Sequence, residues 1–347
     1  MVLIFSALES PPAGISQSRY MIVQGVATAV GLALSVVISL IDYNFFRPFT
    51  KFFIPVGAAA LVLTGLFAPE ISGNHSWIDL GITYVQPAEF IKLLYIVTLA
   101  AHIDKLGDDI NRPKNFIFLL LHAGVYIAGV LVEEDMGMAT IYILIFVIML
   151  VSAGLRVKYM LLAGAPVVAA LPLIWTFVLK DRQRFRILTL FDPTLDPLGY
   201  GYQVIQSKTA IGSGKFFGAG YMQGVMTQTN MIPAKHTDFI FAVCGEEFGF
   251  VGCLAVIAIL LFIVGRIFYD TKKSTDNFGR MILVGVSAML LVQAVINIGM
   301  CIGITPVIGI TLPFFSAGGS SMLSVWLAVG LVLSVLRHRK KNWQEAL

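Results

Sequence analysis

The sequence of 347 residues carries little charge for its length. Only 13% of its residues are charged, about half of the ~25% that is typical of soluble domains. By contrast, 57% are hydrophobic and the mean hydropathy is +0.85. A soluble enzyme, a disordered regulator and a fibrous protein are therefore excluded, and the chain is expected to lie in a membrane. Each charge placed there is costly, so the few charged residues become informative.

Cysteine and excess charge of one sign are scarce as well. Cys244, Cys253 and Cys301 form no Cys-x-x-Cys or Cys/His cluster, which argues against a disulfide framework or a zinc site. We expect them to be small buried hydrophobic residues. The net charge of +4 is mild and forms no basic stripe, so no nucleic-acid partner is expected.

Long apolar runs dominate the sequence. About 20 mostly apolar residues can span a bilayer as a helix. Nine runs meet this condition: 21–41, 52–67, 87–103, 116–132, 138–155, 159–179, 250–269, 281–301 and 322–336. The apolar stretch 1–8 is too short, and it is interpreted as the tail of a first helix or as a re-entrant stub. The prediction is an all-α, polytopic membrane protein with about ten transmembrane helices, the first truncated or divergent, in one domain over 1–347.

Lysine and arginine alternate between the connections. The connections near 42–51, 104–115, 156–158, 266–280 and 337–341 carry 15 of the 24 basic residues. The short connections between them, at 68–86, 133–137 and 302–321, carry none. Because basic loops face the cytoplasm, this pattern predicts a cytoplasmic C-terminus.

The segment 180–249 is predicted to be a long extracytoplasmic loop before the eighth helix. It holds seven basic residues, and long charged loops are candidates for a working site. The alternative is a flexible loop on the bilayer surface whose arginines contact lipid headgroups. Its glycine-rich run 211–220 resembles a phosphate cradle, but lacks the Gly-Lys-Ser/Thr ending of a P-loop.

Several acids stand out against this background. Asp238 lies where the long loop meets an apolar run, which suits a proton acceptor or, alternatively, a helix N-terminal acid. Glu89 and Lys92, at i and i+3 inside a span, indicate a functional site or a structural ion pair. The cluster 133–135 opens a helix, where acids complement the helix dipole, although one of them could pair with a loop arginine. Trp77 is either an interface residue or a platform for stacking a sugar.

Motifs from about Gly73 to the end resemble the SEDS family (shape, elongation, division and sporulation), which includes RodA, FtsW and SpoVE. The segments that carry the resemblance are Gly73, Trp77-Ile78, Gln86-Pro87-Ala88-Glu89-Phe90-Ile91-Lys92, Asp135-Met136-Gly137, Arg186-Ile187-Leu188, Asp192-Pro193, Asp196-Pro197-Leu198-Gly199, Gln206-Ser207-Lys208, Ile211-Gly212-Ser213-Gly214, His236-Thr237-Asp238-Phe239-Ile240-Phe241, Glu246-Glu247-Phe248-Gly249, Asn297-Ile298-Gly299-Met300, Pro313-Phe314 and Gly318-Gly319-Ser320-Ser321. Gln-Ser-Lys and Asn-Ile-Gly-Met resemble the RodA branch, which acts in elongation. Departures from the family pattern are Ser76, Glu134, Thr311 and Ala317.

The resemblance implies a ten-helix glycosyltransferase of the bacterial inner membrane. Such proteins polymerise lipid II into peptidoglycan at the outer face, for cell elongation and shape, with a class B penicillin-binding protein that crosslinks the strands. The family's catalytic aspartate falls on Asp238, its in-membrane pair on Glu89 and Lys92, its helix-start aspartate on Asp135, and its external tryptophan on Trp77.

The mechanistic hypothesis is a single inverting displacement. Asp238 acts as general base on the acceptor hydroxyl, and lipid pyrophosphate leaves. The candidates for binding substrate and neutralising the pyrophosphate are Arg184, Arg186, Lys208, Lys215 and Trp77. The candidates for shaping the cavity are Glu89, Lys92, Asp135, Glu246 and Glu247. A divalent cation could assist at the pyrophosphate, although no ligand cluster in the sequence demands a metal.

Two other functions remain open at this point. A multi-span bundle with intramembrane charges also suits a transporter that flips lipid II. A scaffold that only recruits the transpeptidase is the third alternative. A transporter needs polar groups through the whole membrane depth, whereas those of this sequence gather toward the outer side.

Overall fold

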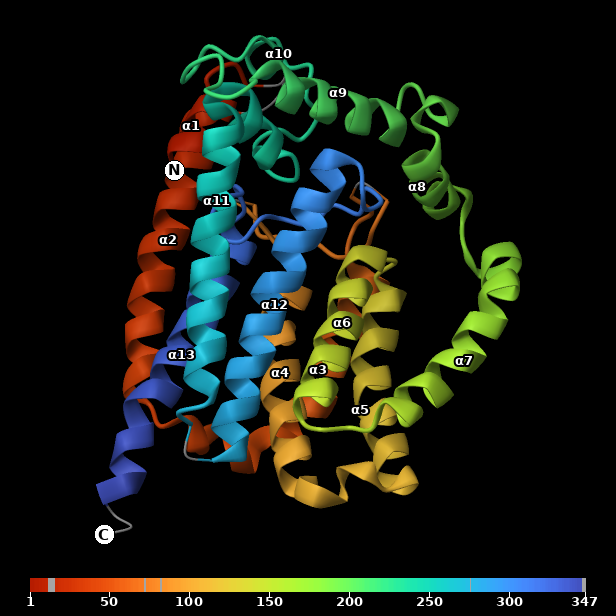
Figure 1. Ribbon diagram of the computed structural model, residues 1–347, viewed down its shortest axis with the longest axis vertical. Helices are drawn as coiled ribbons and strands as arrows, with labels where there is room; N and C mark the ends of the chain where they lie inside the picture. The colour runs from red at the N-terminus through yellow and green to blue at the C-terminus, as the bar shows by residue number, and fades with distance from the viewer. Residues whose placement is uncertain (12–15, 72, 82, 275, 345–347) are drawn as a thin grey trace. The chain divides into compact units, whose positions relative to one another are not determined.

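The computed structural model is built almost entirely of helices (Figure 1). It describes residues 1–11, 16–71, 73–81, 83–274 and 276–344. The α-helices are α1 (Val2–Ala7), α2 (Gln17–Leu40), α3 (Thr50–Phe67), α4 (Pro87–Leu106), α5 (Pro113–Val132), α6 (Met136–Ser152), α7 (Val157–Leu173), α8 (Asp181–Phe191), α9 (Tyr200–Ser213), α10 (Val225–Gln228), α11 (Ile240–Thr271), α12 (Asn277–Ile302) and α13 (Gly319–Gln344). Shorter turns are η1 (Tyr43–Phe49), η2 (Gly107–Asn111), η3 (Ile174–Val178) and η4 (Pro193–Leu195). The strands β1 (Ile78–Asp79) and β2 (Tyr84–Val85) pair antiparallel, with Ile78 opposite Val85.

The all-α membrane fold predicted from hydropathy is confirmed. Each of the nine predicted spans coincides with a helix of the structure. Within the described residues, seven helices are long and apolar enough to cross a membrane: Gln17–Leu40, Tyr43–Phe67, Pro113–Val132, Val157–Phe177, Ile240–Thr271, Asn277–Cys301 and Gly319–His338. Of the other two, α6 is shorter, and α4 carries Glu89, Lys92, Asp104 and Lys105.

The chain packs as two compact units. Unit 1 comprises Met1–Gln24, Leu161–Leu261 and Gln293–Gly318, and unit 2 comprises Gly25–Met160, Phe262–Val292 and the chain from Gly319 onward. Several long helices, such as α11 and α12, begin in one unit and end in the other.

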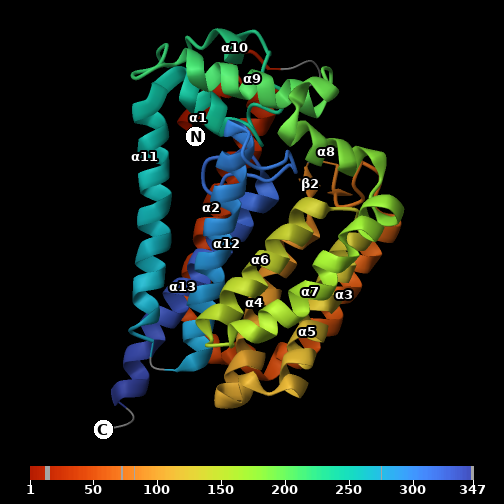
Figure 2. The same ribbon diagram turned by 45° about the vertical axis from the view of Figure 1, so that its right-hand side comes forward.

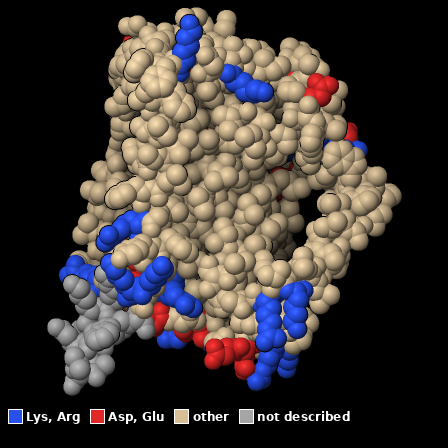
Figure 3. All heavy atoms as spheres, in the orientation of Figure 1, with Lys and Arg blue, Asp and Glu red and all other residues tan. Residues whose placement is uncertain are grey.

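Unit 2 is held together by close helix crossings. A Cβ atom built on Gly129 of α5 would lie 2.8 Å from Leu61 of α3, and one on Gly31 of α2 would lie 2.8 Å from Trp326 of α13. Only small residues permit such approach between apolar helices. The connections α4–α5, α6–α7 and α11–α12 lie at the same end of this unit (Figures 1 and 2), and Figure 3 shows Lys and Arg gathered there.

Unit 1 contains the whole of the long segment 180–249, which is largely helical. This segment is therefore not a flexible loop, because α8, α9 and α10 follow one another and α11 begins at Ile240, ten residues before the predicted span. Contact of its arginines with lipid headgroups stays a prediction. A core of buried apolar side chains, among them Phe239, Phe241 and Leu312, joins this segment to the end of α12. The stub 1–8 forms α1, whose Ala7 belongs to the same core.

Candidate active site

The main chain around Asp238 is held by three donors from the segment 293–318. The carbonyl oxygens of residues 236–238 each accept one hydrogen bond from an N–H or O–H group, and that of Asp238 also accepts a weaker one from the Cys301 thiol at 3.7 Å. The donors are the Ala317 N–H at 2.8 Å, the Ser316 hydroxyl at 2.6 Å and the Asn297 amide at 2.8 Å. Asn297 is fully buried, and its amide also donates to Ile310 O at 2.6 Å. These donors fix the position of each residue in the motif.

The turn before Asp238 is strained. Ala234 has φ = +46°, which is uncommon for a residue with a side chain. Its carbonyl oxygen accepts hydrogen bonds from the N–H groups of Thr237 and Phe239, at 3.1 and 3.2 Å. Phe239 is buried in the core of unit 1. A strained turn persists only where its surroundings over-determine it, as at many functional sites.

The Asp238 carboxylate faces the connection 303–309. A Cβ atom built on Gly309 would lie 3.5 Å from Asp238 Oδ2. At the start of this connection, a Cβ atom on Gly303 would lie 3.8 Å from Lys208 Nζ. An acid and a cation of the predicted site thus flank the same short segment.

The two predicted loop arginines already have contacts in unit 1. Arg184 donates to Thr176 O at 2.9 Å and pairs with Asp181 at 3.3 Å. The guanidinium of Arg186 lies over the Tyr200 ring, 4.8 Å from its centre. Lys208, by contrast, is exposed. Arg184 therefore serves at least in part to fix the start of α8.

The glycine-rich run 211–220 braces a kink rather than cradling a phosphate. Gly249 has φ = +65° and interrupts α11. Across this kink, the carbonyl groups of residues 246–247 bond to the N–H groups of 219–220 at 2.9 and 3.1 Å, and the N–H groups of 250–251 bond to the carbonyl groups of 215–216 at 2.9 and 3.2 Å. The glycines are needed for backbone contact, because a Cβ atom on Gly218 would lie 2.1 Å from the carbonyl oxygen of Glu247. Exposed Lys215 lies in this brace.

The Glu246 and Glu247 side chains bind other segments of unit 1. Glu246 accepts hydrogen bonds from the N–H groups of Met226 and Thr227 and from the Thr227 hydroxyl, at 2.6–2.9 Å. Glu247 accepts one from the Ser6 hydroxyl at 2.5 Å. Both carboxylates therefore hold the surroundings of Asp238 together.

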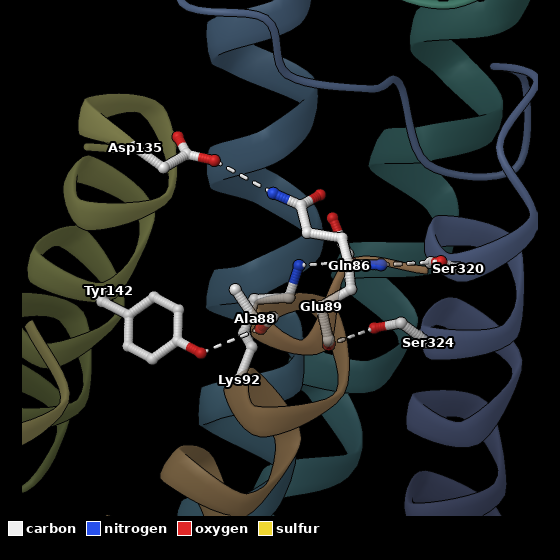
Figure 4. A network of polar contacts seen from close by, with 8 residues as sticks. All are labelled: Gln86, Ala88, Glu89, Lys92, Asp135, Tyr142, Ser320 and Ser324. Carbon is white, nitrogen blue, oxygen red and sulfur yellow. Dashed lines mark hydrogen bonds and ion pairs between the residues drawn. The ribbon is translucent and has the colours of Figure 1, made fainter. Parts of the chain in front are cut away.

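Unit 2 contains a second buried polar network, at the start of α4 (Figure 4). Lys92 Nζ lies 2.8 Å from Glu89 Oε2, and both side chains are almost fully buried. The Ser324 hydroxyl of α13 donates to Glu89 O at 2.7 Å, and the Tyr142 hydroxyl of α6 donates to Ala88 O at 2.9 Å. The predicted i, i+3 pair therefore forms, at a crossing of three helices.

Asp135 joins this network as the N-cap of α6. One of its oxygens accepts from the Met138 N–H at 2.9 Å. The other accepts from the Gln86 side chain at 2.9 Å and from the Ser76 hydroxyl at 3.4 Å. Half-buried Trp77 follows Ser76, directly before β1. The helix-start role expected of an acid at 133–135 thus falls to Asp135.

Glu133, the first acid of the cluster 133–135, does not lie at a helix start but follows the end of α5. It is fully buried, and neither carboxyl oxygen has a hydrogen-bond partner in the part of the chain that the structure describes. Burial, and to a smaller extent the neighbouring Asp135 carboxylate, raise the pKa of this carboxyl to about 9. Its position after α5, rather than at the start of α6, could not be read from three successive acids.

Metal ligands do not cluster in what the structure describes. Among the described residues, no three His, Cys, Asp or Glu side chains are placed so that they could hold a metal ion.

Comparisons with known proteins agree across the chain. The family model for FtsW, RodA and SpoVE, described as "Cell cycle protein", matches residues 1–341. The peptidoglycan glycosyltransferase MrdB of Escherichia coli is 35% identical over 314 residues, which cover 90% of this chain and 84% of that protein. A probable peptidoglycan glycosyltransferase FtsW of Trichlorobacter lovleyi is 34% identical over 316 residues, which cover 90% and 82%.

Solved structures show the same likeness. A structure of a peptidoglycan synthase complex, described as coordinating polymerization and crosslinking, includes a chain that is 29% identical. It has a TM-score of 0.81, with 97% of this chain and 95% of that chain covered. The Thermus thermophilus rod shape determining protein RodA is 26% identical, with a TM-score of 0.70 and coverage of 97% and 93%.

Proposed function

Since the chain belongs to the FtsW, RodA and SpoVE family, we propose that it polymerises lipid II with Asp238 as the general base. The chain is a SEDS peptidoglycan glycosyltransferase of cell wall synthesis and a multi-pass membrane protein. The observation that carries the proposal is the set of three hydrogen bonds that Asn297, Ser316 and Ala317 donate to the carbonyl groups of residues 236–238, which we call the main-chain grip. The Asp238 carboxylate in this segment lies beside Gly309.

The proposed chemistry is one displacement at the anomeric carbon. Asp238 takes the proton of the acceptor sugar hydroxyl as the new glycosidic bond forms, and the lipid pyrophosphate leaves with inversion. The leaving group departs as an anion, so positive charge rather than an acid is required. Lys208 is the first candidate because it flanks the same connection as Asp238, and Lys215 and Arg186 are further candidates. Trp77 is proposed to stack on a sugar.

The proposed setting is the outer face of the bacterial cytoplasmic membrane, with a cytoplasmic C-terminus. The basic connections gathered at one end of unit 2 support this orientation (Figure 3). The proposed partner is a class B penicillin-binding protein, which the likeness to a peptidoglycan synthase complex supports. Motifs of the RodA branch favour a role in elongation.

The test uses the purified full chain with its partner and fluorescently labelled lipid II. Wild type is expected to form glycan strands, and Asp238→Asn to form none, because an amide accepts no proton at neutral pH. Asp108→Asn is the matched control, since Asp108 is exposed and lies in η2. Normal polymerisation by Asp238→Asn would show that another group is the base. Flipping of labelled lipid without polymerisation by wild type would instead favour transport.

A further inference from the structure

Lys235, three residues before Asp238, is a fully buried cation that the proposed chemistry does not use. Its ammonium group donates to Ser10 O at 2.9 Å and to Thr227 O of α10. It therefore connects the 234–239 turn to the N-terminal segment and to α10. Burying an ammonium group is costly unless hydrogen bonds and opposite charge compensate it.

Opposite charge is supplied by α11. Thr227 is the shared partner: its carbonyl group accepts from Lys235, while its N–H and hydroxyl groups donate to Glu246. Glu247 binds Ser6 of α1 at 2.5 Å, four residues before the Ser10 carbonyl group. We name this set of segments the Lys235 clamp: residues 6–10, α10, Lys235 and the pair 246–247. It is contained in unit 1.

Burial and the neighbouring charges shift the pKa of Lys235 in opposite directions. Burial lowers the pKa of the Lys235 ammonium group to about 8, whereas Glu247 and Glu246 favour its charged form. His236 is also buried, and burial together with the Lys235 charge lowers its pKa to about 4, so it is neutral at pH 7. Glu9, in the N-terminal segment, is exposed, and α10 carries no titratable side chain.

We propose that Lys235 is a positioning residue for Asp238, and that its positive charge keeps the 234–239 turn in the conformation that the reaction needs. The inference rests on the proposed role of Asp238. When Lys235 loses its proton, the two buried glutamates lose their only clamp cation among the described residues, and the hydrogen bonds from Lys235 to Ser10 O and Thr227 O weaken, so the turn separates from α10. The strained backbone at Ala234 then relaxes, and Asp238 moves away from Gly309.

The predicted signature is the alkaline side of the pH profile of kcat for lipid II polymerisation. Wild type should lose activity as pH rises through about 8. Lys235→Arg stays charged, so its activity should persist about one pH unit or more higher. Glu247→Gln removes a charge that favours the ammonium form of Lys235, so this variant should begin to lose activity at a lower pH than wild type. The two substitutions are thus expected to move the same limb in opposite directions.

Lys235→Met keeps the unbranched side chain to within one atom of its length but removes the charge. Its kcat should fall about tenfold or more with KM nearly unchanged, because the base is displaced while substrate contacts remain. The pH profile of its remaining kcat should lack the alkaline limb near pH 8. Lys272→Met, at an exposed lysine, is the matched control.

A purely structural lysine would give a different result. Lys235→Met would then lower the melting temperature and the yield, but the folded fraction would keep the wild-type kcat and alkaline limb, which would overturn the proposal. An identical alkaline limb in wild type, Lys235→Arg and Glu247→Gln would overturn it even if Lys235→Met does not fold. Failure of the base assignment is seen separately, as polymerisation by Asp238→Asn.

Discussion

The Asp238 turn of unit 1 and the Glu89–Lys92 network of unit 2 are both buried polar structures, but they are held in opposite ways. In unit 1 the three donors bind the main-chain carbonyl groups of residues 236–238. In unit 2 the acidic side chains themselves are bound, Glu89 to Lys92. A carboxylate bound to a fixed cation is a poor proton acceptor, whereas a fixed backbone can aim a carboxylate at a substrate. This difference favours the proposed roles, which are chemistry for the first region and support of the cavity shape for the second.

The largest expected effect tests the side-chain network. Lys92→Met leaves the Glu89 carboxylate buried without its cation, so it should lower the free energy of unfolding by about 3–5 kcal/mol. The double variant Glu89→Gln/Lys92→Met removes both charges and should recover most of this loss. Thermal unfolding in detergent measures both. Equal destabilisation by the single and the double variant would mean that the ion pair does not organise this region.

The next effect tests the backbone of unit 1. Gly249→Ala places a side chain at positive φ and 2.3 Å from the Gly218 nitrogen, so it should cost about 2–4 kcal/mol. Gly265→Ala in the same helix meets no atom within 4 Å and should be neutral or stabilise by about 0.5–1 kcal/mol. Circular dichroism melts of the two variants compare them directly. Similar melting temperatures would show that the backbone contacts between residues 215–220 and the kink at Gly249 do not stabilise the fold.

A smaller effect should fall mainly on activity. Ser316→Ala removes the donor to Thr237 O and the acceptor of the Leu312 N–H, and should cost about 1–3 kcal/mol of stability together with a loss of kcat. Ser287→Ala is the control, because the buried Ser287 hydroxyl has no hydrogen-bond partner within the described part of the chain. The measurement is the polymerisation rate per folded molecule of the two variants and of wild type. If Ser316→Ala keeps the wild-type kcat, the main-chain grip does not position Asp238.

The smallest effect concerns pH and Glu133. Its pKa is raised in the folded state to about 9 from an ordinary value of 4.5, so folding is penalised increasingly as pH rises between these values. Glu133→Gln removes this penalty. The variant should match wild type below about pH 4 and be more stable by about 1.4 kcal/mol at about pH 5.5, one unit above the ordinary pKa. A stability difference that does not change with pH would show that Glu133 is ionised in the folded protein.

The sequence predicted the helices well because hydropathy depends on local composition. It also singled out Asp238, Glu89 and Lys92, since isolated charges in an apolar sequence are conspicuous. The main-chain grip could not be predicted, because Asn297, Ser316 and Ala317 meet the 236–238 carbonyl groups only through tertiary packing.

Local patterns misled where backbone geometry decides. The glycine-rich run suggested a phosphate cradle, yet its N–H and carbonyl groups bond to the main chain of α11 on the two sides of the kink at Gly249. The same kink explains why α11 begins at Ile240 although its most apolar part begins later. Lys235 was counted only among the basic residues of the loop, and its burial against the N-terminal segment depends on contacts more than 200 residues apart.

The most direct test measures lipid II binding and polymerisation in parallel for Asp238→Asn and Glu89→Gln/Lys92→Met. The comparison predicts that Asp238→Asn binds substrate but forms no strands, whereas the double variant forms strands at a rate within about tenfold of wild type. Strands formed by Asp238→Asn at the wild-type rate, with none formed by the folded double variant, would contradict the assignment of chemistry to unit 1.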